Sequence, residues 1–199
     1  MEILVSDFFK SMEDQLFVEA LAEILAVRNR VLFIPTSKDV QQSMKYLEKT
    51  MNAFQAANIF FEEAVLYDNT DEKLDFTSFS CVFLMGGSLT NQNELLHNDS
   101  ELTAFLKKTE IPLIGFSAGA LNLGETIFIN PDHQEELTTG AKGIGRYDFL
   151  IDVHVAHELK DTKVYAEIEK DLFLLTDGAG LIHDNQQMTF FGKVFLLKS

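Results

Sequence analysis

Apolar residues along the chain recur in two patterns that alternate. Short continuous apolar runs, as at 31–34 and 80–85, are typical of buried strands, whereas apolar residues at helical spacing, as at 40–54, mark amphipathic helices. Strand-like and helix-like segments alternate as far as residue 119. This order predicts a parallel sheet with helices on both faces, joined by right-handed crossovers.

The first half of the chain is expected to hold strands at 3–5, 31–34, 59–66, 80–85 and 111–116, and helices at 11–25, 40–54 and 89–108. Ser11, with Asp14 three residues later, resembles a helix start for the first helix. The third helix is expected to break near residues 98–100, where Asn, Asp and Ser occur in a row.

The second half of the chain has a different pattern. Residues 130–146 are rich in Gly, Pro, Asp and Thr, which predicts irregular structure. Strands are expected at 149–155, 173–176, 180–183 and 188–197, the last two as a hairpin, with a short helix at 160–170. Since no repeat or linker interrupts the sequence, residues 1–199 are expected to form a single α/β domain.

Composition and charge limit the class of protein. The chain is 46% hydrophobic and 24% charged, which is typical of a globular protein. Its formal net charge of −15 argues against nucleic acid or an anionic membrane as a partner, because both require clustered positive charge. A single cysteine, Cys81, excludes an internal disulfide and suits a reducing compartment. With no signal-peptide pattern and no segment of transmembrane length, we expect a cytoplasmic protein.

The segment Gly115-Phe116-Ser117-Ala118-Gly119 follows an apolar run and matches the pattern G-x-S-x-G. The pattern is typical of a tight strand-to-helix turn that holds a serine hydroxyl clear of the sheet. The alternative is an ordinary corner whose serine caps the next helix. Small residues at Ala118 and Ala120, after a buried strand, favour a nucleophile at Ser117.

A serine nucleophile needs a base, which is usually a histidine. Among the five histidines, we select His154 because it ends an apolar strand, which we assign to the same sheet as Ser117. His97 and His183 are interpreted as surface residues. His154 and His157 could share a metal, but no cysteine or glutamate cluster completes such a site, so we expect no metal and no cofactor.

Two aspartates remain open as the acid that would orient the imidazole. Asp132 lies in the loop between Ser117 and His154, and Asp177 follows a late strand. Asp152, two residues before His154 and on the same face of the strand, is interpreted as structural or as a substrate contact.

A tetrahedral oxyanion needs two backbone amide donors. The amide of Ala118, directly after the serine, is one candidate. The turn at Gly86-Gly87-Ser88 can supply the other from Gly87 or Ser88, because glycine lets the backbone approach a substrate closely. A simple tight turn is the alternative interpretation of these glycines.

Three elements together resemble the peptidase E (aspartyl dipeptidase) family of serine peptidases, to which the cyanophycinases are related: the Gly86-Gly87 turn after an apolar strand, the segment 115–120, and a strand ending in His154. The resemblance implies an α/β three-layer sandwich with a mostly parallel central sheet, similar to class I glutamine amidotransferases and flavodoxin-like proteins. It also implies Ser117 as nucleophile, His154 as base and no cofactor.

The resemblance offers both aspartates as the acid. Asp132 occupies the position proposed for the acid in the aspartyl dipeptidases, and Asp177 matches a glutamate of the cyanophycinase-type members. Of the two we favour Asp132.

Departures from the family pattern concern the oxyanion turn and the substrate. Ser88-Leu89-Thr90 stands where family members show a third glycine and then Asn-Thr. No arginine follows Arg146, although aspartyl-specific members carry an arginine-rich segment there, and a lysine lacks the bidentate fork of an arginine.

We therefore expect a serine-type peptidase for short peptides, with N-terminal Asp dipeptides as one option. An esterase or other amidase with the same nucleophile is the first alternative, and a non-catalytic relative that binds a small acidic or peptide ligand is the second. An exposed sheet edge near the N-terminal strand leaves a homodimer open.

Overall fold

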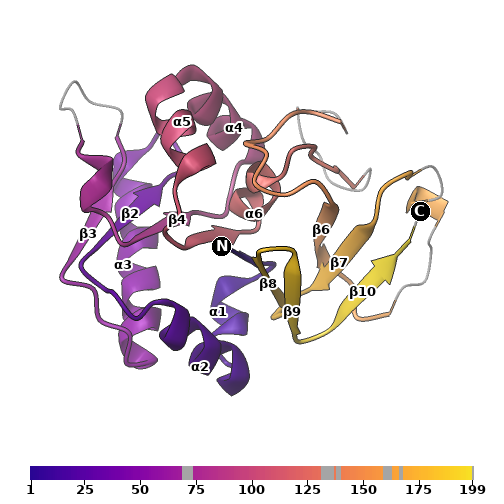
Figure 1. Ribbon diagram of the computed structural model, residues 1–199, viewed down its shortest axis with the longest axis horizontal. Coiled ribbons are helices and arrows are strands. Elements are labelled where there is room, and N and C mark those ends of the chain that lie inside the picture. Colours follow the sequence, from indigo (N-terminus) through magenta and orange to yellow (C-terminus); the bar gives the residue numbers. More distant parts are fainter. Residues whose placement is uncertain (69–73, 131–136, 138–139, 159–162, 166–167, 199) are drawn as a thin grey trace.

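Figure 1 shows the computed structural model, which describes residues 1–68, 74–130, 137, 140–158, 163–165 and 168–198. The strands of this part of the chain form two sheets, and the larger has the order β3-β2-β4-β5-β1-β8-β9. The first five strands in this order are parallel, and β8 and β9 are antiparallel to their neighbours. The strands of the larger sheet are β1 (Glu2–Val5), β2 (Arg30–Ile34), β3 (Glu63–Leu66), β4 (Cys81–Leu84), β5 (Leu113–Phe116), β8 (Gly180–Asp184) and β9 (Gln187–Phe191).

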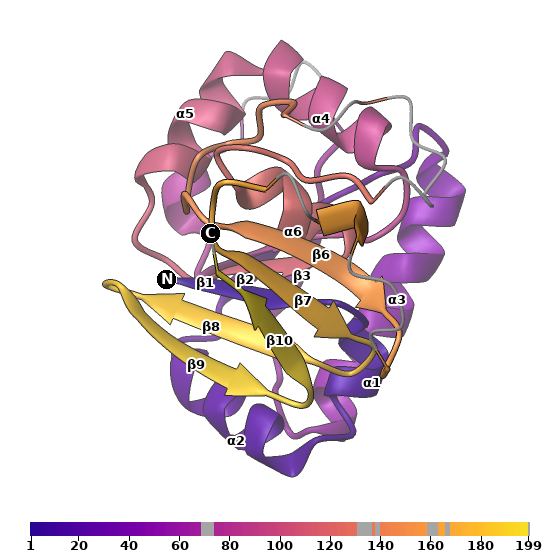
Figure 2. The same cartoon turned by 90° about the vertical axis from the view of Figure 1, so that its right-hand side faces the viewer.

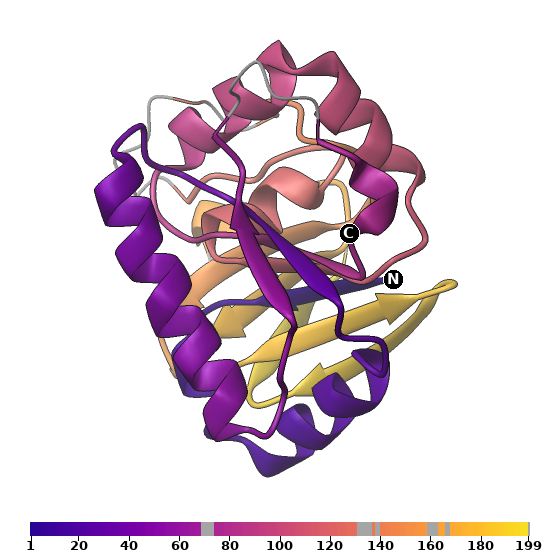
Figure 3. The ribbon, with the colours of Figure 1, turned by 90° about the vertical axis from the view of Figure 1, so that its left-hand side faces the viewer.

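Helices cover both faces of this sheet, as Figures 1 and 3 show. One face carries α1 (Phe8–Ser11), α2 (Gln15–Ile24) and α3 (Val40–Ala56). The other face carries α4 (Leu89–Asn98), α5 (Ser100–Lys108) and α6 (Ala118–Leu123). The predicted α/β sandwich with a mostly parallel central sheet is confirmed, as is the break between α4 and α5.

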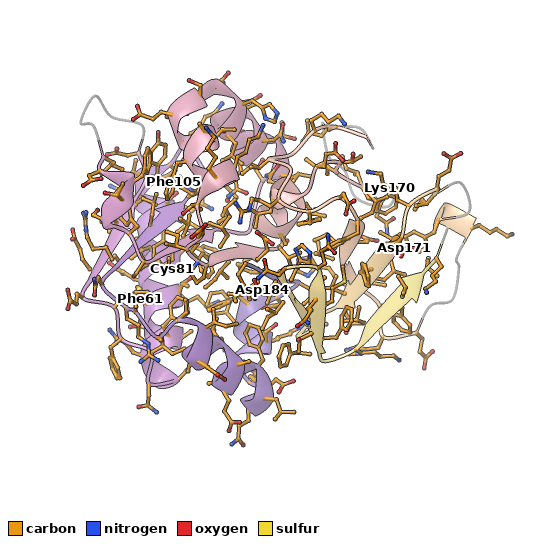
Figure 4. All side chains as sticks on the ribbon, viewed as in Figure 1. Phe61, Cys81, Phe105, Lys170, Asp171 and Asp184 are labelled. Atoms are coloured by element: carbon orange, nitrogen blue, oxygen red, sulfur yellow. The ribbon has the colours of Figure 1, made fainter. Side chains whose placement is uncertain are left out.

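Successive residues of the central strands pack on opposite faces of the sheet, as the two-residue period of a strand requires. On β1, Ile3 and Val5 pack in the cluster that includes the α1–α3 helices, whereas Leu4 packs in the cluster that includes α4–α6. Both clusters consist of fully or nearly fully buried side chains. Cys81 lies inside the sheet as a buried free thiol, whose pKa burial raises (Figure 4). The apolar runs of the sequence are therefore strands that are covered on both faces.

Helix starts are set by short polar side chains, one of which differs from the expected residue. The carboxylate of Asp14 accepts a hydrogen bond from the Leu16 amide, at 2.9 Å, and begins α2. Ser11 instead ends the separate short helix α1, so the start expected at Ser11 was wrong. Residues 8–11 already form α1, so the next helix starts only after Asp14, which serves as its N-cap.

A second, smaller sheet has the order β10-β7-β6, with β6 (Leu150–Val155), β7 (Leu172–Thr176) and β10 (Val194–Leu197) (Figure 2). The strand that carries His154 therefore belongs to this sheet, and its assignment to the sheet of Ser117 was wrong. The predicted strand at 188–197 divides at Gly192, whose φ is 66°. Its first part, β9, stays in the large sheet, and β10 crosses to the small one.

The two sheets are joined by a shared core. Ile151 and Phe173 of the small sheet pack in the same buried cluster as Leu4 and Leu181 of the large sheet. A separate buried cluster that includes Phe128 covers the other face of the small sheet. Packing of this kind fixes the ends of β5 and β6 relative to each other.

Two further expectations differ from the structure. β1 lies between β5 and β8, so the N-terminal strand is not an edge of the sheet. His183 is largely buried on β8, where its Nδ1 lies 2.9 Å from an oxygen of Glu2, rather than on the surface. The other Glu2 oxygen accepts from Arg146 at 2.7 Å.

The helix expected at 160–170 is described only as a short 3₁₀ turn, η2 (Lys163–Tyr165), because residues 159–162 and 166–167 lie outside the described residues. A second 3₁₀ turn, η1 (Phe76–Ser78), precedes β4. Among the described residues, no helix combines the length and the apolar character needed to cross a bilayer.

We expect Phe8→Ala to destabilise the protein by about 3–5 kcal/mol, because Phe8 is fully buried and its ring packs edge-on against Phe54 and Phe83 at 5.2 and 5.0 Å. Urea denaturation of wild type and variant measures the difference. Phe60→Ala is the matched control, since Phe60 is 58% exposed, and it should stay within about 0.5 kcal/mol of wild type. Equal effects of the two substitutions would contradict the core described above.

Candidate active site

Ser117 forms the turn between β5 and α6 in a rare backbone conformation, with φ 51° and ψ −111°. Its amide donates to the carbonyl oxygen of Val5 at 2.8 Å, which ties the turn to β1. Its side chain makes no capping bond to α6, so the helix-cap interpretation does not describe this serine. Gly119 is required behind the turn, because an added Cβ would lie 2.3 Å from the carbonyl oxygen of Leu84. The local structure is the sharp elbow that G-x-S-x-G predicts.

His154 reaches the serine from the other sheet through an irregular end of β6. The pairing of β6 with β7 shifts register between Asp152 and Val155, and His154 has φ 59°. The His154 amide donates to the hydroxyl oxygen of Ser6, fully buried at the end of β1, at 2.7 Å. The imidazole Nε2 lies 2.9 Å from Ser117 Oγ. A bulge of this kind re-aims a side chain, here across the junction of the sheets.

Asp177, just after β7, lies at the other nitrogen of this imidazole. Its Oδ1 is 2.7 Å from His154 Nδ1. A hydrogen bond from Lys10 is the main cause that holds the pKa of the Asp177 carboxyl below its ordinary value; burial opposes it, and the hydrogen bond from His154 adds to the lowering. An ionised carboxylate can only accept, so Nδ1 carries the proton, and in the neutral imidazole Nε2 offers its lone pair to the serine hydroxyl. This tautomer is the one that can take a proton from Ser117.

Two other acidic residues were candidates from the sequence. Asp132 lies outside the described residues. Asp152 is buried, and its Oδ2 accepts from Asn130 Nδ2 and from the Tyr165 hydroxyl, each at 2.9 Å. Since β6 is irregular beyond Asp152, the simple alternation that put Asp152 on the face of His154 does not continue to the end of the strand.

The histidine pair considered for a metal is His154 and His157. The carbonyl oxygen of His157 accepts from Lys193 Nζ at 2.6 Å. Among the described residues, no group of three or more His, Cys, Asp and Glu side chains is arranged to hold a metal ion.

The glycine turn after β4 packs against the serine elbow. A Cβ added to Gly86 would lie 3.0 Å from the Phe116 ring, next to Ser117. Gly87 has φ 132°, and a Cβ there would lie 2.3 Å from Thr36 Oγ1, which itself donates to the Gly86 carbonyl at 2.8 Å. Glycine is therefore required at 87 both by its φ and by the contact with Thr36.

Ser88 uses its side chain locally. Its hydroxyl oxygen accepts from the Asn91 amide at 3.2 Å and caps α4. The donor predicted at this residue is its backbone amide. The amide of Ala118 comes from the first residue of α6, directly after Ser117.

A cavity of about 310 Å³ borders the glycine turn at the carboxyl ends of β2 and β4. The connections from these two strands run to opposite faces of the sheet, which is where open α/β sheets commonly bind ligands. Its lining residues are uncharged: Thr36, Ser43 and Asn91 contribute polar groups, and Tyr46 and Met85 contribute apolar surface.

Several residues that hold this site carry no motif and were missed from the sequence. Ser6 and Lys10 flank the start of α1, and Gln92 is buried in α4, where its amide donates to the Ile34 and Met85 carbonyls at 3.1 and 3.2 Å. The one signal in the sequence that could have found Ser6 is its position directly after the end of a strand. Nothing in the sequence distinguishes Lys10 from the other lysines.

The model of peptidase family S51 matches residues 3–190. The chain belongs to peptidase family S51. It is a serine peptidase, and thus a hydrolase, as the sequence predicts. The resemblance to peptidase E is confirmed by this match.

Among solved structures, this S51 peptidase is similar in fold to the crystal structure of a peptidase from an acI-B1 Actinobacterium, with a TM-score of 0.68 and 15% sequence identity. The match covers 99% of this chain and 90% of that chain. The comparison with curated proteins finds no match.

We expect Gly87→Ala to slow labelling of Ser117 by a fluorophosphonate about 10- to 100-fold, because the added methyl group displaces the turn and its amide beside the serine. Labelling rates are measured by intact-protein mass spectrometry. Gly140→Ala is the matched control: Gly140 also has positive φ, but a Cβ there meets nothing within 4 Å. Wild-type labelling rates in both variants would exclude a role for this turn.

Proposed function

We propose that this S51 peptidase hydrolyses short peptides through an acyl-enzyme formed on Ser117, with His154 as the base and Asp177 as the acid that orients it. The observation that carries the proposal is the continuous chain of contacts from Ser117 Oγ to His154 Nε2, 2.9 Å, and from Nδ1 to Asp177 Oδ1, 2.7 Å. These three residues come from separate segments of both sheets, and their side chains meet in one line.

In the first step, Ser117 Oγ attacks the scissile carbonyl carbon while its proton moves to His154 Nε2. The carbonyl π electrons move onto oxygen, which the amides of Ala118 and of Gly87 or Ser88 would stabilise. The C–N bond then breaks, and the imidazolium gives its proton to the leaving amine. In the second half, His154 Nε2 takes a proton from the water that attacks the acyl carbon. The ester C–O bond then breaks, the imidazolium returns its proton to Ser117 Oγ, and the acid product leaves.

The acid is assigned to Asp177 rather than to Asp132, the residue favoured from the sequence. A neutral imidazole has one N–H to donate once Nε2 serves as the base, and the Asp177 carboxylate lies on that group. The carboxyl pKa of Asp177 is lowered, which keeps it anionic when the imidazole becomes charged.

The positions of the arginines support substrates other than N-terminal Asp peptides. Arg28 donates to backbone carbonyls, Arg30 pairs with Glu63 and Arg146 pairs with Glu2. Each of the chain's three arginines therefore has partners away from Ser117, and none is left to hold a substrate carboxylate in a bidentate manner. The uncharged cavity beside Gly87, at the small end of ligand-binding volumes, fits a small neutral group better.

We expect dipeptides with a neutral N-terminal residue to be hydrolysed with kcat/KM at least equal to that of N-terminal Asp dipeptides, because an aspartate side chain finds no arginine at the site. A panel of both classes, with a short-chain aryl ester, is assayed by product release.

Ser117→Ala should abolish turnover of the whole panel, whereas Ser100→Ala, at an exposed serine that begins α5, should leave it unchanged. Peptidase activity retained in Ser117→Ala would overturn the nucleophile. A tenfold preference for N-terminal Asp would overturn the substrate assignment, and hydrolysis of the ester alone would favour an esterase.

A further inference from the structure

The connection from β1 to α1, residues 5–10, touches every member of the proposed triad. The Val5 carbonyl accepts from the Ser117 amide at 2.8 Å, and Ser6 Oγ accepts from the His154 amide at 2.7 Å. Lys10 Nζ donates to Asp177 Oδ2 at 2.7 Å. We call these residues the β1–α1 corner.

Ser6 also reaches the loop that carries Asp177. Its amide donates to the Ala179 carbonyl at 3.1 Å, two residues beyond Asp177. The corner thus contacts the backbone on both sides of the junction between the sheets, and Lys10 adds a contact to a triad side chain.

The side chain of Lys10 is half exposed, but its backbone is held in place at the start of α1. Its helix begins at Asp7, whose carboxylate accepts from the Phe9 and Lys10 amides at 3.0 and 3.3 Å. Phe8, which follows Asp7, anchors this turn of helix in the core through its ring contacts. The loop of Asp177 packs on the same side chain, because a Cβ added to Gly178 would lie 3.5 Å from Lys10 Cβ.

The two oxygens of Asp177 therefore have separate partners. Oδ1 meets His154 Nδ1 and Oδ2 meets Lys10 Nζ, each at 2.7 Å. A carboxylate held at one oxygen can rotate about its Cβ–Cγ bond, whereas one held at both oxygens is fixed in plane and in direction.

We propose that Lys10 is a positioning residue of this peptidase, which fixes the Asp177 carboxylate and through it the direction of the His154 imidazole. The inference rests on the proposed triad. Lys10 takes no proton in the reaction and touches no reacting atom.

The charges around this contact agree with the inference. Lys10 is the first cause that lowers the pKa of the Asp177 carboxyl, and Asp177 is in turn the first cause that raises the pKa of Lys10. Asp7 and Glu13, on the same side of the corner, raise the Lys10 pKa further. The pair is therefore ionised at neutral pH.

On the side of the small sheet, the backbone of Lys193 lies close to Asp177: the Lys193 carbonyl accepts from the hydroxyl of Thr176, the residue before Asp177, at 3.0 Å. Its ammonium is directed to the His157 carbonyl at 2.6 Å. Lys10 is thus the lysine that is paired with Asp177.

Lys10→Met tests the inference on the best dipeptide of the panel. We expect kcat to fall about three- to tenfold with KM within about twofold of wild type, because orientation of the base is lost and substrate contacts are kept. Without the cation, the pKa of Asp177 rises toward its ordinary value, so the carboxylate is neutralised at higher pH as pH falls. Loss of activity from protonation of the Asp177 carboxyl should therefore begin at a higher pH in the variant than in wild type.

Two control variants complete the experiment. Lys10→Arg keeps the charge and the reach and should restore kcat and the pH profile. Lys45→Met removes an exposed lysine of α3 and should match wild type. A rise in KM at unchanged kcat would overturn the inference, since Lys10 would then bind substrate, and wild-type kinetics in Lys10→Met would also overturn it.

A readout without turnover separates this inference from the proposed function. The downfield NMR resonance of the His154 Nδ1 proton reports its bond to Asp177. It should be sharp in wild type, Lys10→Arg and Lys45→Met, and broadened by solvent exchange in Lys10→Met. That pattern would support positioning by Lys10 even if no peptide is hydrolysed, whereas a sharp resonance in Lys10→Met would overturn it.

Discussion

The contact between Ser117 Oγ and His154 Nε2, 2.9 Å long, joins two different sheets, and the site exists only if those sheets are docked correctly. β5 supplies the serine and β6 the histidine. The shared apolar core between the sheets fixes their distance, and the buried hydroxyl of Ser6 fixes the end of β6 on β1. A mispacked small sheet would leave the serine without its base while the large sheet stays intact.

Both side chains of this contact depend on backbone conformations that are unfavourable for residues other than glycine. Ser117 and His154 have φ of 51° and 59°, and such conformations cost about 1–3 kcal/mol each. They persist because neighbours hold them: the Ser117 amide bonds to Val5 and the His154 amide bonds to Ser6. Two buried clusters on the faces of the sheet supply the rigidity for this. The strain thus occurs where the side chains must leave the regular direction of their elements.

The sequence predicted the central sheet and its helices because apolar runs and helical spacing are local signals. The G-x-S-x-G elbow was predicted for the same reason, and the family confirms a serine peptidase. The second sheet was missed, because strand partners far apart in sequence leave no local pattern, and the crossing at Gly192 looks like one continuous strand. The choice between Asp132 and Asp177 also depended on distance in space. Lys10 could not be predicted, because its role comes from one contact with a residue near the other end of the chain.

The most direct test of the proposed triad is a crystal structure of the protein after reaction with a fluorophosphonate. We predict phosphorus bonded to Ser117 Oγ, its oxygen facing the amides of Ala118 and of Gly87 or Ser88, and Asp177 on His154 Nδ1 with Lys10 on its second oxygen. Phosphorus on another residue, or the Asp132 carboxylate on His154 Nδ1, would contradict the account.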